Sequence, residues 1–179
     1  MSGHNKWAQI KHQKAVTDAK KSKIFSKLVC FISVEAKLAK GDINTPGLRA
    51  AIEKAKKVNM PFENIDRAIK KASEPSIQME TIAYETYGPG GVGLIIETLT
   101  DSRNRTAQDI KHILAENGFV LANIGSVIWS FAREKTTEGI IWKPNIFIPV
   151  SDSDLKLLEK LVDDLEENDD VHEVYTNAE

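Results

Sequence analysis

Hydrophobic positions in the first 75 residues recur at helical spacing, which predicts three amphipathic helices. The first begins at Thr17 or Asp18 and ends at Gly41, and the second covers about residues 46–58. The third follows Pro61, because proline suits the first turn of a helix. The apolar positions that define the three helices are, in order, Ile24, Leu28, Phe31 and Ile32; Leu48, Ile52 and Ala55; and Phe62, Ile65, Ile69 and Ala72.

The spacing changes after a short linker at residues 73–76, and the remaining chain reads mainly as strands. Strands are predicted at residues 82–86, 92–99, 126–131, 138–142, 146–150 and 171–175. Helices are predicted from Asp101 or Ser102 to Gly118, and from Ser151 over the stripe that ends at Leu165. Short strands interrupted by two helices predict an α+β sandwich, with the helices covering one face of a mainly antiparallel sheet.

Charge divides the chain at the same place. Residues 1–75 hold 16 Lys and Arg against 7 Asp and Glu, a net charge of +9, whereas residues 76–179 hold 8 against 19, a net charge of −11. The overall charge of −2 conceals this asymmetry, which indicates a polyanionic partner for one end. We therefore expect a basic helical domain with an N-terminal arm at residues 1–75 and an acidic α+β domain at residues 76–179.

Several function classes find no support in the sequence. The single cysteine, Cys30, excludes an internal disulfide and a cysteine-based metal cage, and the four histidines are scattered. The glycine-rich segment 88–93 lacks the Gly-Lys-Ser/Thr of a phosphate loop, so we interpret it as a hairpin turn. No signal peptide or membrane-spanning run is visible. We expect a cytoplasmic, non-enzymatic protein with no cofactor, metal, membrane or small-molecule partner.

Lysines around an aromatic residue make the N-terminal arm a candidate nucleic-acid site. Lysines that neutralise phosphates release counterions, and Trp7 could stack on an unpaired base. The alternative is a solubilising lysine face with Trp7 in the core. Residues 1–40 hold nine lysines and two acidic residues, which favours binding. The candidates from this region are Lys6, Trp7, Lys11, His12, Lys14, Lys20, Lys21 and Lys23.

A second candidate contact lies at the predicted start of the helix after residue 102. Arg103, Asn104 and Arg105 would place two guanidinium groups beside the free N–H groups of a helix N-terminus, an arrangement that suits phosphate. The alternative is that the arginines pair locally with Asp101 and Asp109.

The order of these segments resembles the YebC family. The resemblance rests on SGHNKWAQIKHQKAVTDAKKSKIFSKL at the start, YETYGPGGVGLIIETLTDSRNRT and GSVIWSF in the middle, and VYTNAE at the end. It implies a nucleic-acid-binding regulator of gene expression, since family members are described as transcriptional regulators that bind DNA. The alternative is an RNA- or ribosome-associated translational activator, like the mitochondrial translational activator of cytochrome oxidase subunit I.

The chain departs from the family pattern in one respect. Family members usually carry a further α/β domain inserted within the second, and here only residues 133–145 stand in its place. We expect the inserted domain to be largely missing. Lys6, Trp7, Lys11, His12, Lys14 and Arg103 to Arg105 lie in segments that match the family.

Overall fold

The computed structural model describes residues 18–71, 79–136 and 139–179, which fall into two compact units. The helical unit comprises residues 18–71, Met79 and the hairpin end Glu134–Ile141. The sheet unit comprises Glu80–Arg133 and Trp142–Glu179. Each unit has its own hydrophobic core.

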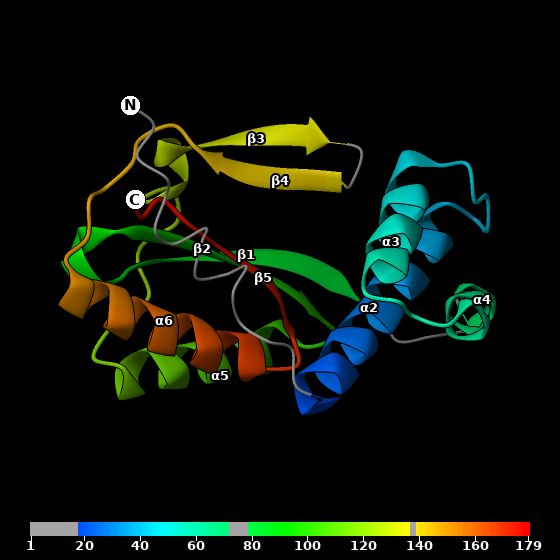
Figure 1. Ribbon diagram of the computed structural model, residues 1–179, viewed down its shortest axis with the longest axis horizontal. Helices are drawn as coiled ribbons and strands as arrows, with labels where there is room; N and C mark the ends of the chain where they lie inside the picture. Colours follow the sequence, from blue (N-terminus) through cyan, green and yellow to red (C-terminus); the bar gives the residue numbers. More distant parts are fainter. Residues whose placement is uncertain (1–17, 72–78, 137–138) are drawn as a thin grey trace. The chain divides into compact units, whose positions relative to one another are not determined.

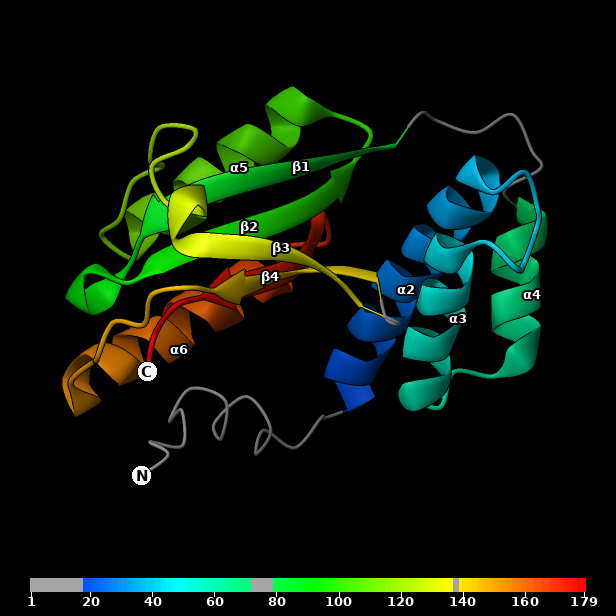
Figure 2. The ribbon, with the colours of Figure 1, turned by 90° about the horizontal axis from the view of Figure 1, so that it is seen from above.

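Three helices, α2 (Asp18–Leu38), α3 (Pro46–Lys57) and α4 (Phe62–Lys71), lie side by side in the helical unit (Figure 2). The amide of Gly41 donates to the Ala36 carbonyl at 2.9 Å and so ends α2 where the sequence predicts. The core mixes large residues such as Ile32 and Leu48 with fully buried alanines of α3, including Ala51. These small side chains let the three helices pack closely.

One predicted core position of the helical unit is wrong. Phe62 is 74% exposed, and Ala68, which lies three residues after the buried Ile65, takes an inward position instead. Helical side chains tilt toward the N-terminus, so the side chain of the first residue of α4 projects past the end of the helix rather than into the core.

The sheet unit is built on three antiparallel strands in the order β1–β2–β5 (Figure 1). These are β1 (Glu80–Tyr87), β2 (Gly93–Thr100) and β5 (Val171–Thr176). A 3₁₀ turn, η1 (Pro89–Gly91), joins β1 to β2, with φ values of 68° at Gly90 and 79° at Gly91. Such values favour glycine, and the predicted glycine-rich hairpin turn is confirmed.

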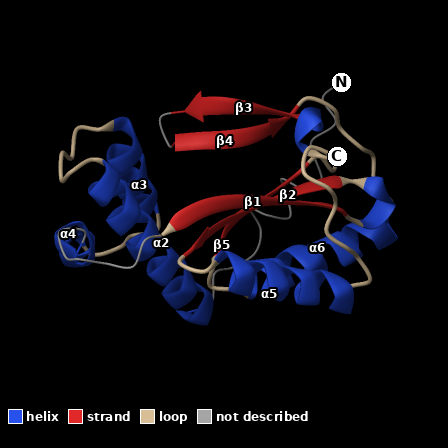
Figure 3. Cartoon of the chain, turned by 180° about the vertical axis from the view of Figure 1, so that it is seen from behind, coloured by secondary structure: helices blue, strands red, loops and turns tan. Residues whose placement is uncertain are grey.

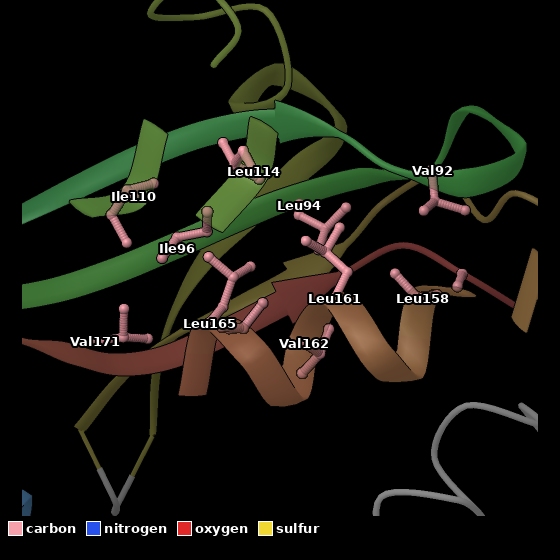
Figure 4. Close-up of a cluster of buried hydrophobic side chains, with 12 residues drawn as sticks. Val92, Leu94, Ile96, Ile110, Leu114, Leu158, Leu161, Val162, Leu165 and Val171 are labelled. Atoms are coloured by element: carbon pink, nitrogen blue, oxygen red, sulfur yellow. The ribbon is translucent and has the colours of Figure 1, made fainter. Parts of the chain in front are cut away.

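Two helices, α5 (Arg103–Glu116) and α6 (Asp152–Glu167), lie against one face of this sheet (Figure 3). Figure 4 shows their leucines and isoleucines meeting the side chains of β2. The Ser151 hydroxyl accepts a hydrogen bond from the Asp154 amide at 3.1 Å, the N-cap expected from the sequence. The predicted α+β class, three helices followed by a mainly antiparallel sandwich, is confirmed.

The opposite face of the sheet is covered by a short 3₁₀ turn, η2 (Ile128–Ser130), and by the start of the hairpin β3 (Phe131–Thr136) and β4 (Gly139–Pro144). Ile95 of β2 packs there with Val127 and Phe131. The Trp142 indole N–H donates to a Glu97 carboxylate oxygen at 2.8 Å.

Two predicted strands are absent from the structure. Residues 126–130 form a turn that continues as η2, and strand begins only at Phe131. The buried carboxylate of Glu85 accepts the amides of Gly125, Val127 and Ile128 and so bends the chain here. Residues 146–150 contribute only an isolated bridge between Ile148 and Ala178. Apolar composition alone predicted both strands.

Candidate nucleic-acid interface

Most of the predicted contacts of the N-terminal arm lie outside the described residues: Lys6, Trp7, Lys11, His12 and Lys14. Lys20 and Lys21 lie on the described backbone of α2, but their side chains are outside the description. Lys23 lies on α2 with an exposed side chain. The arm's part in binding therefore stays a prediction.

The described helical unit is itself strongly basic. Residues 18–71 hold 13 Lys and Arg against 6 Asp and Glu. Several of these cations are exposed on α3 and α4, outside the candidate positions at the N-terminus: Arg49, Lys56, Lys57, Arg67 and Lys70. The net charge of residues 1–75 already counts these five cations. It does not show which of them lie on the surface.

Two of these lysines form exposed ion pairs within their own helices. Lys56 lies 2.9 Å from Glu53, and Lys70 lies 2.7 Å from Asp66. The Lys56 hydrogen bond lowers the pKa of Glu53 below its ordinary value. Exposed pairs of this kind contribute little to stability, so phosphate can compete for the lysines at small cost.

Lys54 serves the packing of the helical unit rather than its surface charge. Its ammonium group lies 5.7 Å from the centre of the Phe31 ring, within the range of a cation–π contact, and the residue is partly buried. Lys54 is therefore not counted among the exposed basic residues that could contact phosphate.

The structure places Arg103, Asn104 and Arg105 in the first turn of α5, as the sequence predicts. All three residues are exposed. Arg103 pairs with Glu80 at 2.9 Å, and Arg105 pairs with Asp101 at 2.9 Å.

Asp170, at the end of the loop after α6, is the second partner of Arg105. Its two carboxylate oxygens accept from the guanidinium group at 2.9 and 3.1 Å. The same carboxylate accepts from the hydroxyl of Thr106 at 2.6 Å and from that of Thr100 at 3.3 Å. These hydrogen bonds tie α5, the end of β2 and the approach to β5 together.

The alternative of local pairing is thus correct for Asp101, while no ion pair with Asp109 exists among the described residues. Hydrogen bonds that the guanidinium groups donate to Glu80 and Asp170 raise the pKa of Arg103 and Arg105 respectively, so both groups stay charged. Because three carboxylates already balance these two cations, the corner offers a phosphate less positive potential than its residue types suggest.

Within the described ranges, no group of three His, Cys, Asp or Glu side chains could hold a metal ion. None of the helices in those ranges is long and apolar enough to cross a membrane.

The two parts of the chain match two domain families that belong to the same protein family. Residues 5–75 match the family described as the TACO1/YebC protein N-terminal domain. Residues 79–137 and 133–178 match the family described as the TACO1/YebC second and third domain.

Relatives of this chain carry the name "probable transcriptional regulatory protein". One from Fervidobacterium nodosum is 40% identical over 235 aligned residues, which cover 99% of this chain and 93% of the relative. Another from Pseudothermotoga lettingae is 44% identical over 183 residues and covers 100% and 71%. The crystal structure of a conserved hypothetical protein from Aquifex aeolicus has a TM-score of 0.83 and 33% identity, and covers 97% of this chain and 96% of that one.

Proposed function

Because the chain belongs to the TACO1/YebC family, we propose that it regulates gene expression by binding nucleic acid through its basic helical unit. The observation that carries this proposal is the segregation of charge. The helical unit is basic on the exposed faces of three helices, while the sheet unit is acidic. A phosphate backbone is attracted by the first and repelled by the second.

The charge pattern also sets what kind of binding to expect. Lysines and arginines on helix surfaces contact phosphates and fix the position of a nucleic acid, but they do not read its sequence. The affinity should therefore fall steeply with salt, and sequence preference should be weak or indirect.

Transcription is the process that the names of the relatives indicate. We accordingly propose a DNA-binding, non-enzymatic regulator of transcription. Action on translation through RNA or the ribosome is the alternative implied by the mitochondrial relative, and comparison of binding to DNA, RNA and ribosomes separates the two.

We also propose that residues 1–75 and 76–179 act as separate domains, and that the short connection at residues 133–145 stands where relatives carry an inserted domain. With that domain missing, the basic residues of the helical unit would supply most of the binding energy.

The test measures binding of the full chain to duplex DNA, single-stranded RNA and ribosomes across a range of salt concentrations. We expect the double variant R49E/R67E to weaken binding and to lower the slope of log affinity against log salt by about 0.9 for each phosphate that the protein no longer neutralises. The variant with Lys11, Lys14, Lys20 and Lys21 changed to Glu should lose binding while keeping its fold.

The matched control is K111E/K156E, which reverses two exposed lysines on α5 and α6 of the sheet unit. Unchanged binding in the control and reduced binding in the helical variants support the proposal. Equal loss in both would contradict it. Ribosome association that survives about 0.15 M salt with only weak DNA binding would overturn the transcription role and favour translation.

A further inference from the structure

Exposed apolar side chains gather at one end of the sheet unit. Seven large hydrophobic residues in the described part of this unit are exposed, and six of them form what we call the apolar patch. The seventh, Leu157, lies on α6. The patch consists of Tyr87, Val120, Ile124, Trp129, Ile146 and Phe147.

Hydrogen bonds between three separate segments bring these residues together. The Thr86 hydroxyl donates to the Val120 carbonyl at 2.8 Å, which places Val120 beside the end of β1. The Asn145 amide donates to the Ser130 carbonyl at 2.9 Å. Because Ile146 follows Asn145 and Trp129 precedes Ser130, the segment after β4 meets the segment before β3.

Two aromatic rings of the patch are fixed by a single carbonyl group. The Tyr87 hydroxyl and the Trp129 indole N–H each donate to the carbonyl oxygen of Ser126 at 2.6 Å. Their polar edges are thus satisfied within the chain, yet Trp129 remains 64% exposed and Tyr87 46% exposed. Neither ring has a further N–H or O–H to donate, so what they mainly offer a partner is aromatic surface.

The backbone between the two rings is fixed by hydrogen bonds to the buried side chain of Glu85. Glu85, only 4% exposed, accepts the amide of Gly125 at 2.6 Å and that of Val127 at 2.7 Å. Ser126 lies between these two anchored residues, so the carbonyl that fixes both rings has a defined position. The rings are presented in an ordered arrangement before any partner binds.

The patch also interrupts the acidic surface of the sheet unit. Residues 117–133 and 142–150 contain no Asp or Glu, although residues 76–179 contain 19. The charged side chains of these two segments are Arg133 and Lys143, which lie within three residues of the bonded pair Ser130 and Asn145. Fewer carboxylates therefore oppose a polyanion here than elsewhere on the unit, although Glu179 lies beside Phe147, since its amide donates to the Ile148 carbonyl at 2.9 Å.

We propose that Trp129 and Tyr87 form a stacking site for unpaired bases of single-stranded RNA, with Arg133 and Lys143 beside the path of its backbone. This inference rests on the proposed nucleic-acid binding, adds a second contact to it, and favours the RNA alternative over duplex DNA as the polymer bound at this site. Aromatic faces bind bases without reading their edges, which suits rings whose own polar edges are occupied. Single strands and loops of RNA present such bases, whereas the bases of duplex DNA are stacked inside the helix.

The test uses the full chain and an adenine-rich RNA of about 12 nucleotides, within the length that a stacking surface accommodates. We expect W129A to weaken binding about tenfold, the typical loss of one stacked base. W129F should retain most of the affinity, because a ring remains. L157A, which removes the exposed side chain outside the patch, should bind like the unchanged chain.

Two readouts separate this site from the basic helical unit. W129A should leave the salt dependence unchanged, since stacking releases no counterions, whereas R49E/R67E should lower it. The part of the tryptophan fluorescence that W129F removes should be quenched by the RNA in the unchanged chain and not by duplex DNA.

Each remaining result counts against the stacking site. Unchanged RNA affinity in W129A overturns it while the proposed function stands. Equal losses for RNA and duplex DNA overturn the preference for unpaired bases. Self-association that W129A abolishes, with RNA binding intact, assigns the patch to a second copy of the chain. No binding of any nucleic acid by the unchanged chain removes the proposed function itself.

Discussion

The two units of this molecule differ in how they use polar groups. In the helical unit, helices pack mainly through apolar side chains and small alanines, and its described ion pairs lie on the surface within single helices. The Ser33 hydroxyl, which donates to the Ala68 carbonyl at 3.0 Å, is a part-buried polar contact between two of these helices. In the sheet unit, buried polar side chains connect segments that are far apart in sequence. Asn177, for example, accepts the amide of Gly93 across the sheet at 2.7 Å.

This difference separates stability from binding. Where charges lie on the surface, substitutions should alter nucleic-acid affinity with little effect on folding. Where polar groups are buried, loss of one partner leaves others unsatisfied, and folding should suffer. Substitutions in each unit can therefore test this contrast.

The largest effect is expected from Glu85 of the sheet unit. E85A would leave the buried amide of Val127 and the partly buried amides of Gly125 and Ile128 without their acceptor. We expect a loss of about 4 kcal/mol in the free energy of unfolding, measured by urea denaturation. E80A on the same strand removes only an exposed ion pair with Arg103 and should cost about 0.5 kcal/mol. Similar losses of stability in the two variants would contradict the view that the Glu85 carboxylate stabilises the fold by binding these backbone amides.

Glu85 also explains where sequence reasoning reached its limit. Hydrophobic spacing predicted the five helices α2 to α6 and the three sheet strands, because each pattern is local. The segment 126–131 has the apolar composition of a strand, but its conformation is set by a carboxylate about 40 residues away. No local pattern carries that information.

The candidate site shows the same limit. The first turn of α5 was predicted with its two arginines, and Asp101, four residues before Arg105, could be named as a partner. Asp170 could not, because it lies 65 residues further along the chain and meets Arg105 only through the fold. Charge sums located the basic unit, whereas the apolar patch depends on three segments that only the structure brings together.

The next largest effect tests the apolar packing of the helical unit. Ile32 is fully buried in its core, so I32A should cost about 3 kcal/mol. Hydrogen exchange should accelerate in α2, α3 and α4 while the amides of β2 keep their protection. Faster exchange throughout both units would show that they unfold together and would remove the basis of the comparison.

A smaller effect is expected at the polar connection around Asp170. The fully buried hydroxyl of Thr106 donates to Asp170 at 2.6 Å, and T106V replaces it with a methyl group of similar shape. We expect the free energy of unfolding, measured by thermal or urea denaturation, to fall by about 2 kcal/mol, a typical contribution of a hydrogen bond to a charged group. T106S retains the hydroxyl and should recover most of the loss. If serine and valine behave alike, packing rather than the hydrogen bond stabilises this corner.

The smallest effect is a response to pH that has opposite signs in the two units. Burial raises the pKa of Glu35 in the helical unit above its ordinary value of 4.5. A raised pKa means that the folded state binds the proton more tightly, so this contribution to stability is present below about pH 4.5 and is lost as pH rises through the folded pKa. Hydrogen bonds from Lys160 and Asn117 lower the pKa of Asp164 in the sheet unit below 3.8. That contribution is present above about pH 3.8 and is lost as pH falls through the folded pKa.

Comparing each variant with the unchanged chain isolates these two groups from Glu53, whose lowered pKa opposes Glu35 within the helical unit. E35Q should remove a gain in stability of the helical unit on acidification, and D164N should remove a loss in the sheet unit. Unfolding followed by hydrogen exchange between pH 6 and pH 3 reports the two units separately. The two substitutions should therefore change the pH dependence of stability with opposite signs. Changes of the same sign would mean that burial does not control the pKa of Glu35 and that hydrogen bonding does not control the pKa of Asp164. The contrast between the units would then hold only for their neutral side chains.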